Sequence, residues 1–221
     1  MKIVVSGASG LIGTALVSDW SAAGHTVVRL VRKAPSGRED SAFWNPDSGE
    51  LDPRIIDKAD AMVHLSGENI AQGRWTAARK ARIRDSRIAS TKCVVQALLR
   101  ASNPPKTFLC ASATGYYGHR GDERLAETSG PGSGFLAEVC QAWEAATKPA
   151  SDCGVRVVNL RFGMVLSGEG GALRAMLPVF KLGIGGVIGN GRQYMSWIAI
   201  DDLIGAIRFL LDDESLSGPV N

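Results

Sequence analysis

Three glycines near the start of the chain have a spacing that suits binding of a phosphate-bearing ligand. They follow the apolar run 1–6 and precede residues with helical spacing that continue to Gly24. In such a motif the first glycine permits a tight turn, the second lets the backbone approach a pyrophosphate, and the third allows close packing of helix on strand. Amides at the helix N-terminus then face the phosphates. The motif therefore predicts dinucleotide binding rather than a purely structural turn, with contacts from Gly7, Ser9, Gly10, Leu11, Ile12 and Gly13.

The residues that end the second apolar run indicate which dinucleotide is bound. An NAD site places Asp or Glu there to bind the ribose 2′-hydroxyl. This chain instead has Arg29, Arg32 and Lys33, with no acid before Glu39. A dianionic 2′-phosphate suits a forked guanidinium. The alternative is a solvated basic loop. We predict NADP as the cofactor, with Arg32 as its main contact and Lys33 beside it.

The stretch S-A-T-G-Y-Y-G at 112–118 offers hydroxyl groups for proton transfer. It follows the apolar run 107–111, and ligands of parallel sheets bind at the carboxyl ends of the strands. Ser112 or Thr114 could donate a hydrogen bond to a substrate carbonyl, and Tyr116 or Tyr117 could act as a general acid. The alternative interpretation is that both tyrosines are amphipathic packing at the mouth of a cleft.

Apolar runs that alternate with helical segments must position these residues. The pattern is typical of an α/β protein, here a Rossmann-type doubly wound parallel sheet with helices on both faces and small C-terminal substrate-side elements. We expect an NADP-binding domain over 1–165, and over 166–221 a substrate-side loop and the last helix and strands, packed on the same domain. The polar segment 33–52 is expected to be a loop or small hairpin. The predicted strands are 1–6, 26–32, 59–66, 107–112 and 155–162, and the predicted later helices are 75–102, 135–150 and 201–213.

The composition narrows the function classes. The 221 residues are 45% hydrophobic and 21% charged with a net charge of +3, which is ordinary for a globular protein and gives no sign of a nucleic-acid or membrane role. No run reaches the roughly 18 apolar residues of a membrane span. The three histidines do not have metal-ligand spacing. We expect a cytoplasmic protein without a signal peptide that acts on a small molecule, holds no metal and keeps its cysteines reduced in the core: Cys93, Cys110, Cys140 and Cys153.

Segment 74–87 carries six cations against one acid, Asp85. A helical period places the apolar side chains of the following turns on one face, near Arg84 and Arg87, while Arg79 and Arg82 point elsewhere. A cation on a buried face is costly unless it is paired. We therefore expect Arg87, and with it Arg84, to be an anion ligand or ion-pair partner, and Arg82 to reach the adenosine end from its own side. The alternatives are a solvated face or a nucleic-acid patch, although interleaved aromatic residues are missing.

Taken together, the motifs resemble the atypical branch of the extended short-chain dehydrogenase/reductases that is labelled "epimerase family protein". The resemblance covers all 221 residues. It implies that Leu65, Ser66, Gly67 and Glu68 lie along the cofactor. It also implies a further C-terminal segment that helps to close the substrate cleft, since members of this branch continue beyond the last helix seen here. The motifs that carry it are G-A-S-G-L-I-G, H-L-S-G-E-N-I, S-A-T-G-Y-Y-G, F-L-A-E-V-C-Q-A-W-E, L-R-F-G-M-V-L-S and M-S-W-I-A-I-D-D-L.

The same resemblance raises a difficulty for catalysis. Short-chain reductases use a tyrosine with a lysine four residues later, and none of the three tyrosines here has one: positions 120, 121 and 198 hold Arg, Gly and Ile. Phe135 and Val139 occupy the places of that pair. Arg120 or Arg161 could supply the missing positive charge to Tyr116 or Tyr117. The chain is then either an NADP-dependent oxidoreductase or epimerase-like enzyme, or a non-catalytic NADP(H)-binding sensor.

Two further segments are expected at the cleft. Arg161, with Gly163 and Val165, should border the nicotinamide. The glycine-rich stretch 181–197 could form a mobile lid over the substrate, or it could be an irregular surface loop.

Overall fold

The computed structural model describes residues 1–33, 40–187 and 189–221, and its centre is one eight-stranded sheet. The strand order is β10-β7-β6-β5-β1-β2-β3-β4, and all neighbours are parallel except β3 and β4. This order confirms the predicted Rossmann-type sheet. The strands are β1 (Lys2–Ser6), β2 (Thr26–Val31), β3 (Ser41–Asn45), β4 (Glu50–Leu51), β5 (Ala61–His64), β6 (Thr107–Ala113), β7 (Arg156–Phe162) and β10 (Gly218–Val220).

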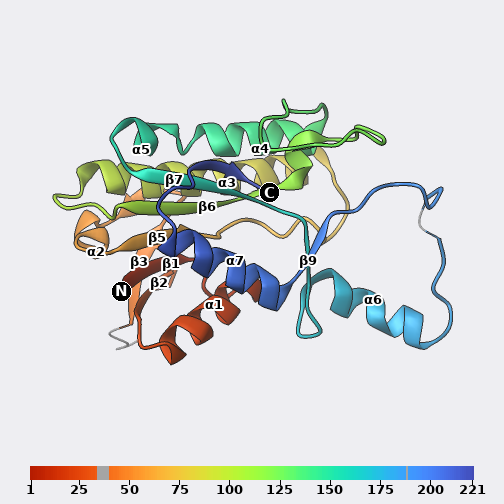
Figure 1. Ribbon diagram of the computed structural model, residues 1–221, viewed down its shortest axis with the longest axis horizontal. Helices are drawn as coiled ribbons and strands as arrows, with labels where there is room; N and C mark the ends of the chain where they lie inside the picture. Colours follow the sequence, from red (N-terminus) through yellow and green to blue (C-terminus); the bar gives the residue numbers. More distant parts are fainter. Residues whose placement is uncertain (34–39, 188) are drawn as a thin grey trace.

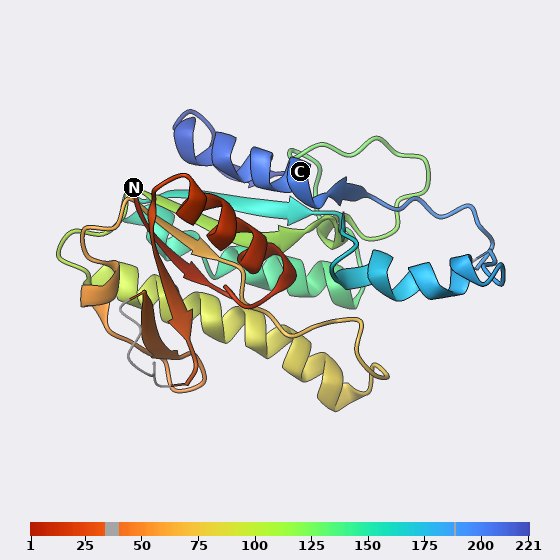
Figure 2. The same cartoon turned by 90° about the horizontal axis from the view of Figure 1, so that it is seen from below.

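Helices cover both faces of the sheet, as Figures 1 and 2 show. The helices α1 (Leu11–Ala22) and α7 (Ile200–Asp212) pack together on one face. The other face carries α3 (Ala77–Arg100), α4 (Phe135–Ala145) and α5 (Lys148–Asp152), while the short α2 (Pro53–Ile56) contacts α3. None of the described helices has the length and hydropathy of a membrane span.

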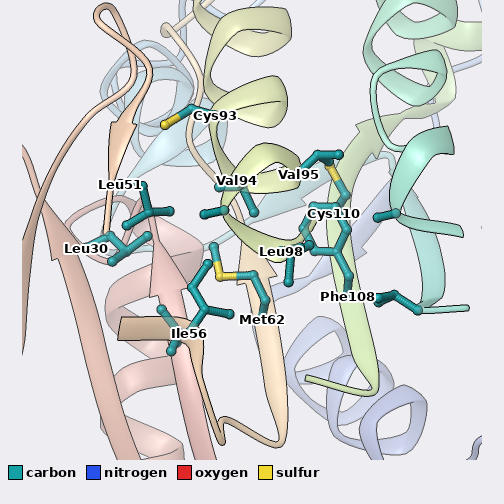
Figure 3. Close-up of a cluster of buried hydrophobic side chains, with 14 of the residues drawn as sticks. Leu30, Leu51, Ile56, Met62, Cys93, Val94, Val95, Leu98, Phe108 and Cys110 are labelled. Atoms are coloured by element: carbon teal, nitrogen blue, oxygen red, sulfur yellow. The ribbon is translucent and has the colours of Figure 1, made fainter. Parts of the chain in front are cut away.

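Alternation along the strands supplies a separate core for each face. Ile3 and Val5 of β1 pack with the helices of the first face, whereas Val4 between them faces α3. Successive side chains of a strand point to opposite faces, so one short apolar run serves both layers. Figure 3 shows the α3 side, where Met62 and Phe108 meet Val94 and Leu98.

Segment 33–52 contains more regular structure than a loop. Its described part holds the hairpin β3–β4, which confirms the hairpin alternative, and β3 also extends the main sheet in parallel with β2. Burial of Trp44 and Leu51 against the core explains why this polar segment joins the sheet. Residues 34–39, which include Glu39, the first acid after the predicted second strand, lie outside the described residues.

The C-terminal part forms a separate two-stranded sheet before its last strand, β10, joins the main sheet. Strand β8 (Met164–Leu166) pairs with β9 (Trp197–Ala199), and the chain between them runs out through the exposed helix α6 (Gly171–Lys181), which projects from the body in Figure 1. Residues 182–187 and 189–196 form no helix or strand and are exposed, so a lid role there stays a prediction. The domain boundary at residue 165 also stays a prediction.

The cysteines only partly follow the prediction. Cys93, Cys110 and Cys140 are buried and unpaired, but Cys153 is exposed at the end of α5. Placing Cys153 in the core was therefore wrong. Its neighbour Gly154 has a φ of 87°, which marks the turn that brings the chain from this helix to β7.

Candidate functional site

The glycine motif lies at the point where the sheet reverses its winding. Strands β1 and β5 are neighbours, and the chain leaves them for helices on opposite faces, which opens a crevice at their carboxyl ends. Gly7 has a φ of 72°, and a Cβ atom there would lie 2.8 Å from the carbonyl carbon of Leu65. A Cβ atom on Gly13 would lie 2.2 Å from the Gly7 oxygen. These two positions exclude any side chain.

Gly10 differs from the other two glycines. It is exposed, and a Cβ atom on it would meet only the Gly7 oxygen, at 3.3 Å. Ser9 is exposed as well, while Leu11 and Ile12 are half-buried at the start of α1. The second glycine therefore faces open space, as a ligand-facing position must. The loop fits the pyrophosphate of a dinucleotide.

Exposed cationic side chains follow β2. Arg32 and Lys33 are exposed and have no ion-pair partner in the described part of the chain. The nearby acid Asp40 is instead paired with Arg29. The donor set beside the crevice is therefore cationic, which fits a phosphate better than a ribose hydroxyl.

Side chains of α3 hold the loop that follows β5. Arg79 forms an ion pair with Glu68 and donates to the carbonyl oxygen of Asn69. The Glu68 amide donates to Ser86 Oγ at 3.1 Å. Leu65 and Ser66 are half-buried and Gly67 is exposed. Of the residues predicted along the cofactor here, Glu68 has its carboxylate committed to Arg79.

The structure corrects the predicted face of the basic helix. Arg79 is buried, whereas Arg84 is exposed and paired with its neighbour Asp85. Placing Arg84 inward and Arg79 outward was wrong, because Arg79 and Ile83 lie in phase with the buried residues at positions 90, 94 and 97. Arg82 is exposed.

Arg87 does lie inward, but no carboxylate binds it in the described structure. Its Nη1 donates to the carbonyl oxygens of Glu68, at 3.1 Å, and Ile83, at 2.9 Å. The guanidinium also lies over the Trp143 ring, 5.0 Å from the centroid. Burial lowers the pKa of Arg87 from its usual value. Its contribution here is to hold the loop after β5, and a direct contact with the cofactor stays a prediction.

The two tyrosines lie on a rigid turn at the carboxyl end of β6. The turn η1 (Thr114–Tyr117) follows the strand directly. The Gly132 amide donates to the Tyr116 carbonyl oxygen at 2.9 Å, and a Cβ atom on Gly132 would lie 1.9 Å from the Tyr117 oxygen. Tyr116 is half-buried and Tyr117 is buried. Segment 130–133 therefore clamps the turn.

A buried ion pair lies directly beneath this turn. Arg161 at the end of β7 donates from Nε and Nη2 to the two oxygens of Glu144 on α4, both at 2.9 Å. Its side chain is 3% exposed and that of Glu144 is 13% exposed. The third nitrogen, Nη1, donates to the Tyr117 hydroxyl at 2.7 Å, and the guanidinium carbon lies 3.6 Å from the centroid of the Tyr116 ring. Burial works against the charge of Arg161, but the hydrogen bonds to Glu144 and Tyr117 outweigh it and raise the pKa of the guanidinium.

The hydrogen bonds around the ion pair distinguish the predicted catalytic side chains from one another. Ser112 donates to Glu144 Oε1 at 2.6 Å, and the Tyr117 hydroxyl lies within hydrogen-bond distance of the Ala126 oxygen and Asn221 Oδ1, at 3.0 and 2.7 Å. The hydroxyl of Tyr116 has no hydrogen-bond partner among the described residues. Of the two candidate cations, Arg161 contacts both tyrosines, whereas Arg120 pairs with Glu123 near the surface.

Sequence reasoning missed Glu144 altogether. A signal was present, since Glu144 follows Trp143 on a helix whose buried face includes Ala137, Cys140 and Trp143. A carboxylate beside such a face needs a partner cation. Only the fold identifies that partner as Arg161, 17 residues away in the sequence.

Comparison with known proteins now decides the family. The model of the NAD dependent epimerase/dehydratase family matches residues 3–220. The chain belongs to this family. It is 48% identical over 219 residues to an epimerase family protein of Mycobacterium bovis, with 99% of this chain and 72% of that protein covered.

Solved structures of family members agree. The human epimerase family protein SDR39U1, solved with NADPH, is 33% identical with a TM-score of 0.90, covering 100% of this chain and 73% of that one. A nucleoside-diphosphate sugar epimerase of Corynebacterium glutamicum is 40% identical with a TM-score of 0.86, and this chain spans 46% of its length. A nicotinamide dinucleotide is therefore the cofactor class of this epimerase/dehydratase family chain.

Proposed function

We propose that the chain is an NADP(H)-dependent oxidoreductase or epimerase-like enzyme acting on a small molecule. The choice of NADP is supported by Arg32 and Lys33, which are exposed and free of described ion-pair partners at the end of β2. The solved human relative carries NADPH. When bound, a nicotinamide would supply or accept a hydride, and the side chains of this chain would bind the substrate and move a proton.

Proton transfer is assigned to Tyr116. One observation carries this choice: the Arg161 guanidinium lies 3.6 Å from the centre of the Tyr116 ring. A cation over an aromatic face is favourable for the neutral ring, and it is more favourable for the negative charge that grows on the phenol oxygen as the proton leaves. Arg161 thereby supplies the charge that a lysine on α4 would have supplied, since Val139 occupies that place.

Cofactor choice is tested by comparing NADPH and NADH affinity in Arg32→Ala, measured by calorimetry. Hydrogen bonds to a charged group contribute about 1.5–3 kcal/mol, so NADPH affinity should fall about 10- to 100-fold, and NADH affinity should not change. Arg54→Ala is the matched control, because Arg54 is an exposed arginine on α2 and pairs with Asp52, the N-cap residue of that helix. Equal weakening of both dinucleotides by Arg32→Ala would count against the 2′-phosphate contact.

Turnover is tested with NADPH and a panel of carbonyl and enone substrates. Tyr116→Phe should lose at least about 100-fold in kcat, the usual contribution of a positioned general acid. Tyr117→Phe should keep NADPH binding and lose less, because its hydroxyl is bonded inside the protein. If Tyr116→Phe keeps full turnover, the assignment to Tyr116 fails.

A non-catalytic NADP(H) sensor is the second candidate, and two observations favour it. Phe135 and Val139 occupy the places of the family's usual proton-transfer pair, and the hydroxyls of Ser112 and Tyr117 are committed to protein partners. Tight NADPH binding without turnover of any compound in the panel would support this second function.

A further inference from the structure

Neither cofactor binding nor proton transfer uses the cluster formed by Trp75, Phe135 and Lys80, which we call the aromatic shelf. The rings of Trp75 and Phe135 meet edge to face, with centroids 5.6 Å apart and planes at 73°. The Lys80 ammonium lies 5.3 Å from the Phe135 centroid. Trp75 is 40% exposed and Phe135 is half-buried. Large aromatic surface in water is costly, so a shelf with an exposed indole suggests a ligand-binding surface.

The shelf is held firmly in place. Trp75 Nε1 donates to the carbonyl oxygen of Ile70 at 2.9 Å, which fixes the indole. Thr76 caps α3 by accepting from the Arg79 amide at 3.2 Å. The Arg79 side chain in turn holds Glu68 and Asn69 of the same loop. Rigid aromatic surface binds a ligand with little loss of conformational entropy.

The shelf adjoins the turn that carries Tyr116. Gly115 of that turn packs on the first residues of α4: a Cβ atom there would lie 3.6 Å from Leu136 Cβ and 3.8 Å from Cys140 Sγ. Phe135 is the first residue of α4 and directly precedes Leu136. A substrate whose reacting carbon lies near Tyr116 therefore has the shelf within reach of the rest of its structure.

The shelf has more cations than carboxylates around it: Glu138, in the first turn of α4, is the exposed acid of that helix turn. Lys80 has no ion-pair partner in the described ranges, and Arg74 and Arg82 of the same segment are exposed. The nearest carboxylate of the loop, Glu68, is neutralised by Arg79. A ligand on the shelf meets the exposed indole of Trp75, with the Phe135 ring standing at 73° to it and the Lys80 ammonium over that ring.

We propose that the aromatic shelf is the substrate-binding surface and selects a substrate that joins a planar apolar group to a carboxylate or other anion. The planar group stacks on the exposed Trp75 ring with its edge toward Phe135, and the anion is bound by Lys80. The inference rests on the proposed function in one respect only, because it takes Tyr116 to mark the reacting end of the substrate. Its test measures binding alone, so it can fail while NADPH binding and turnover succeed.

The test uses three probe molecules on the NADPH-saturated full chain, with affinities from calorimetry. They are 2-naphthoate (planar and anionic), 2-naphthamide (planar and neutral) and cyclohexanecarboxylate (anionic and not planar). 2-Naphthoate should bind most tightly of the three. Trp75→Leu should weaken both naphthyl probes about tenfold. Lys80→Gln should weaken 2-naphthoate about fivefold and leave 2-naphthamide unchanged.

Two matched variants control for general effects. Lys92→Gln removes an exposed lysine farther along α3, and Phe209→Leu removes an exposed aromatic residue from α7 on the other face of the sheet. Both should bind 2-naphthoate as the unaltered chain does, and NADPH affinity should be the same in all four variants. Absence of saturable 2-naphthoate binding, or equal binding in Trp75→Leu and the unaltered chain, would overturn the proposal. Equal loss of both naphthyl probes in Lys80→Gln would overturn the assignment of the anion to Lys80.

Discussion

Replacement of Arg161 by methionine is the most direct test of the buried ion pair beneath the tyrosine turn. Methionine approximates the length of the arginine stem but carries no charge and no donors. The change leaves Glu144, which is 13% exposed, with Ser112 as its remaining side-chain donor among the described residues. It also removes the donor to the Tyr117 hydroxyl.

The size of the effect follows from what is left behind. Removing one partner of a buried ion pair costs about 3–5 kcal/mol, mainly because the other charge stays buried without compensation. Replacing both partners by apolar residues of similar volume is often close to neutral. We therefore expect Arg161→Met to lose about 3–5 kcal/mol in the free energy of unfolding, and the double variant with Glu144→Leu to lose less than the sum of the single changes.

Urea denaturation at pH 7 measures both quantities. The slope with urea concentration must stay constant for the comparison to hold, and the four proteins form a double-mutant cycle that isolates the coupling. The exposed pair of Arg208 and Asp19 is the matched control: it has the same two-bond geometry, with bonds of 2.6 and 2.5 Å, but lies at the surface between α7 and α1. Arg208→Met should cost no more than about 1 kcal/mol.

Two outcomes would refute this reasoning. A loss below about 1 kcal/mol in Arg161→Met would mean that Glu144 finds water or another donor, and that the pair is not effectively buried. Additivity of the two changes within about 0.5 kcal/mol would mean that the two side chains do not depend on each other.

Two further predictions concern the strands and helices that carry the site. His64 is fully buried between Ser6 and Ser90, and desolvation lowers its pKa to about 3. Below about pH 6.5 only the unfolded state takes up a proton at this residue, so the free energy of unfolding should fall by about 1.3 kcal/mol between pH 7 and pH 5.5. Urea titrations of His64→Asn should lack this loss. Gly13→Ala should destabilise the chain by at least about 2 kcal/mol, because the new Cβ atom would clash with the Gly7 oxygen. Gly205→Ala on α7 should instead stabilise it by about 0.5–1 kcal/mol in thermal unfolding, because a Cβ atom there meets nothing within 4 Å. Equal effects of the two changes would contradict the steric argument.

Local patterns in the sequence predicted the features that depend on near neighbours. The glycine spacing predicted the loop between β1 and α1, and the close contacts of Gly7 and Gly13 give its physical reason. The hydrophobic runs predicted the parallel sheet because each strand serves two cores. The cations after β2 were predicted to bind a phosphate, and Arg32 and Lys33 are exposed there without an ion-pair partner among the described residues.

Features set by distant partners were not predictable in the same way. Arg79 is buried because Glu68, on a loop 11 residues earlier, neutralises it. The helical phase of the buried residues of α3 points Arg79 inward, but that phase does not identify Glu68 as its partner, and the prediction placed Arg84 inward instead. The pairing of β3 with β2 in the main sheet was not predictable for a related reason, since the segment around β3 is polar and only the burial of Trp44 shows that it packs on the core.

The cation beside the tyrosines is positioned differently from the lysine of the usual tyrosine–lysine pair. A tyrosine and a lysine four residues apart share one helix, so helical geometry alone sets their separation. Here the ring is on the turn after β6 and the cation is on β7, and the register between these strands pairs Ser112 with Arg161. Sheet register, with Glu144 of α4 as the anchor, therefore takes over the positioning that one helical turn would otherwise provide. Arginine suits this arrangement and lysine does not, because the guanidinium has enough donors in a fixed plane to bind both oxygens of Glu144 and the Tyr117 hydroxyl while its face lies over Tyr116.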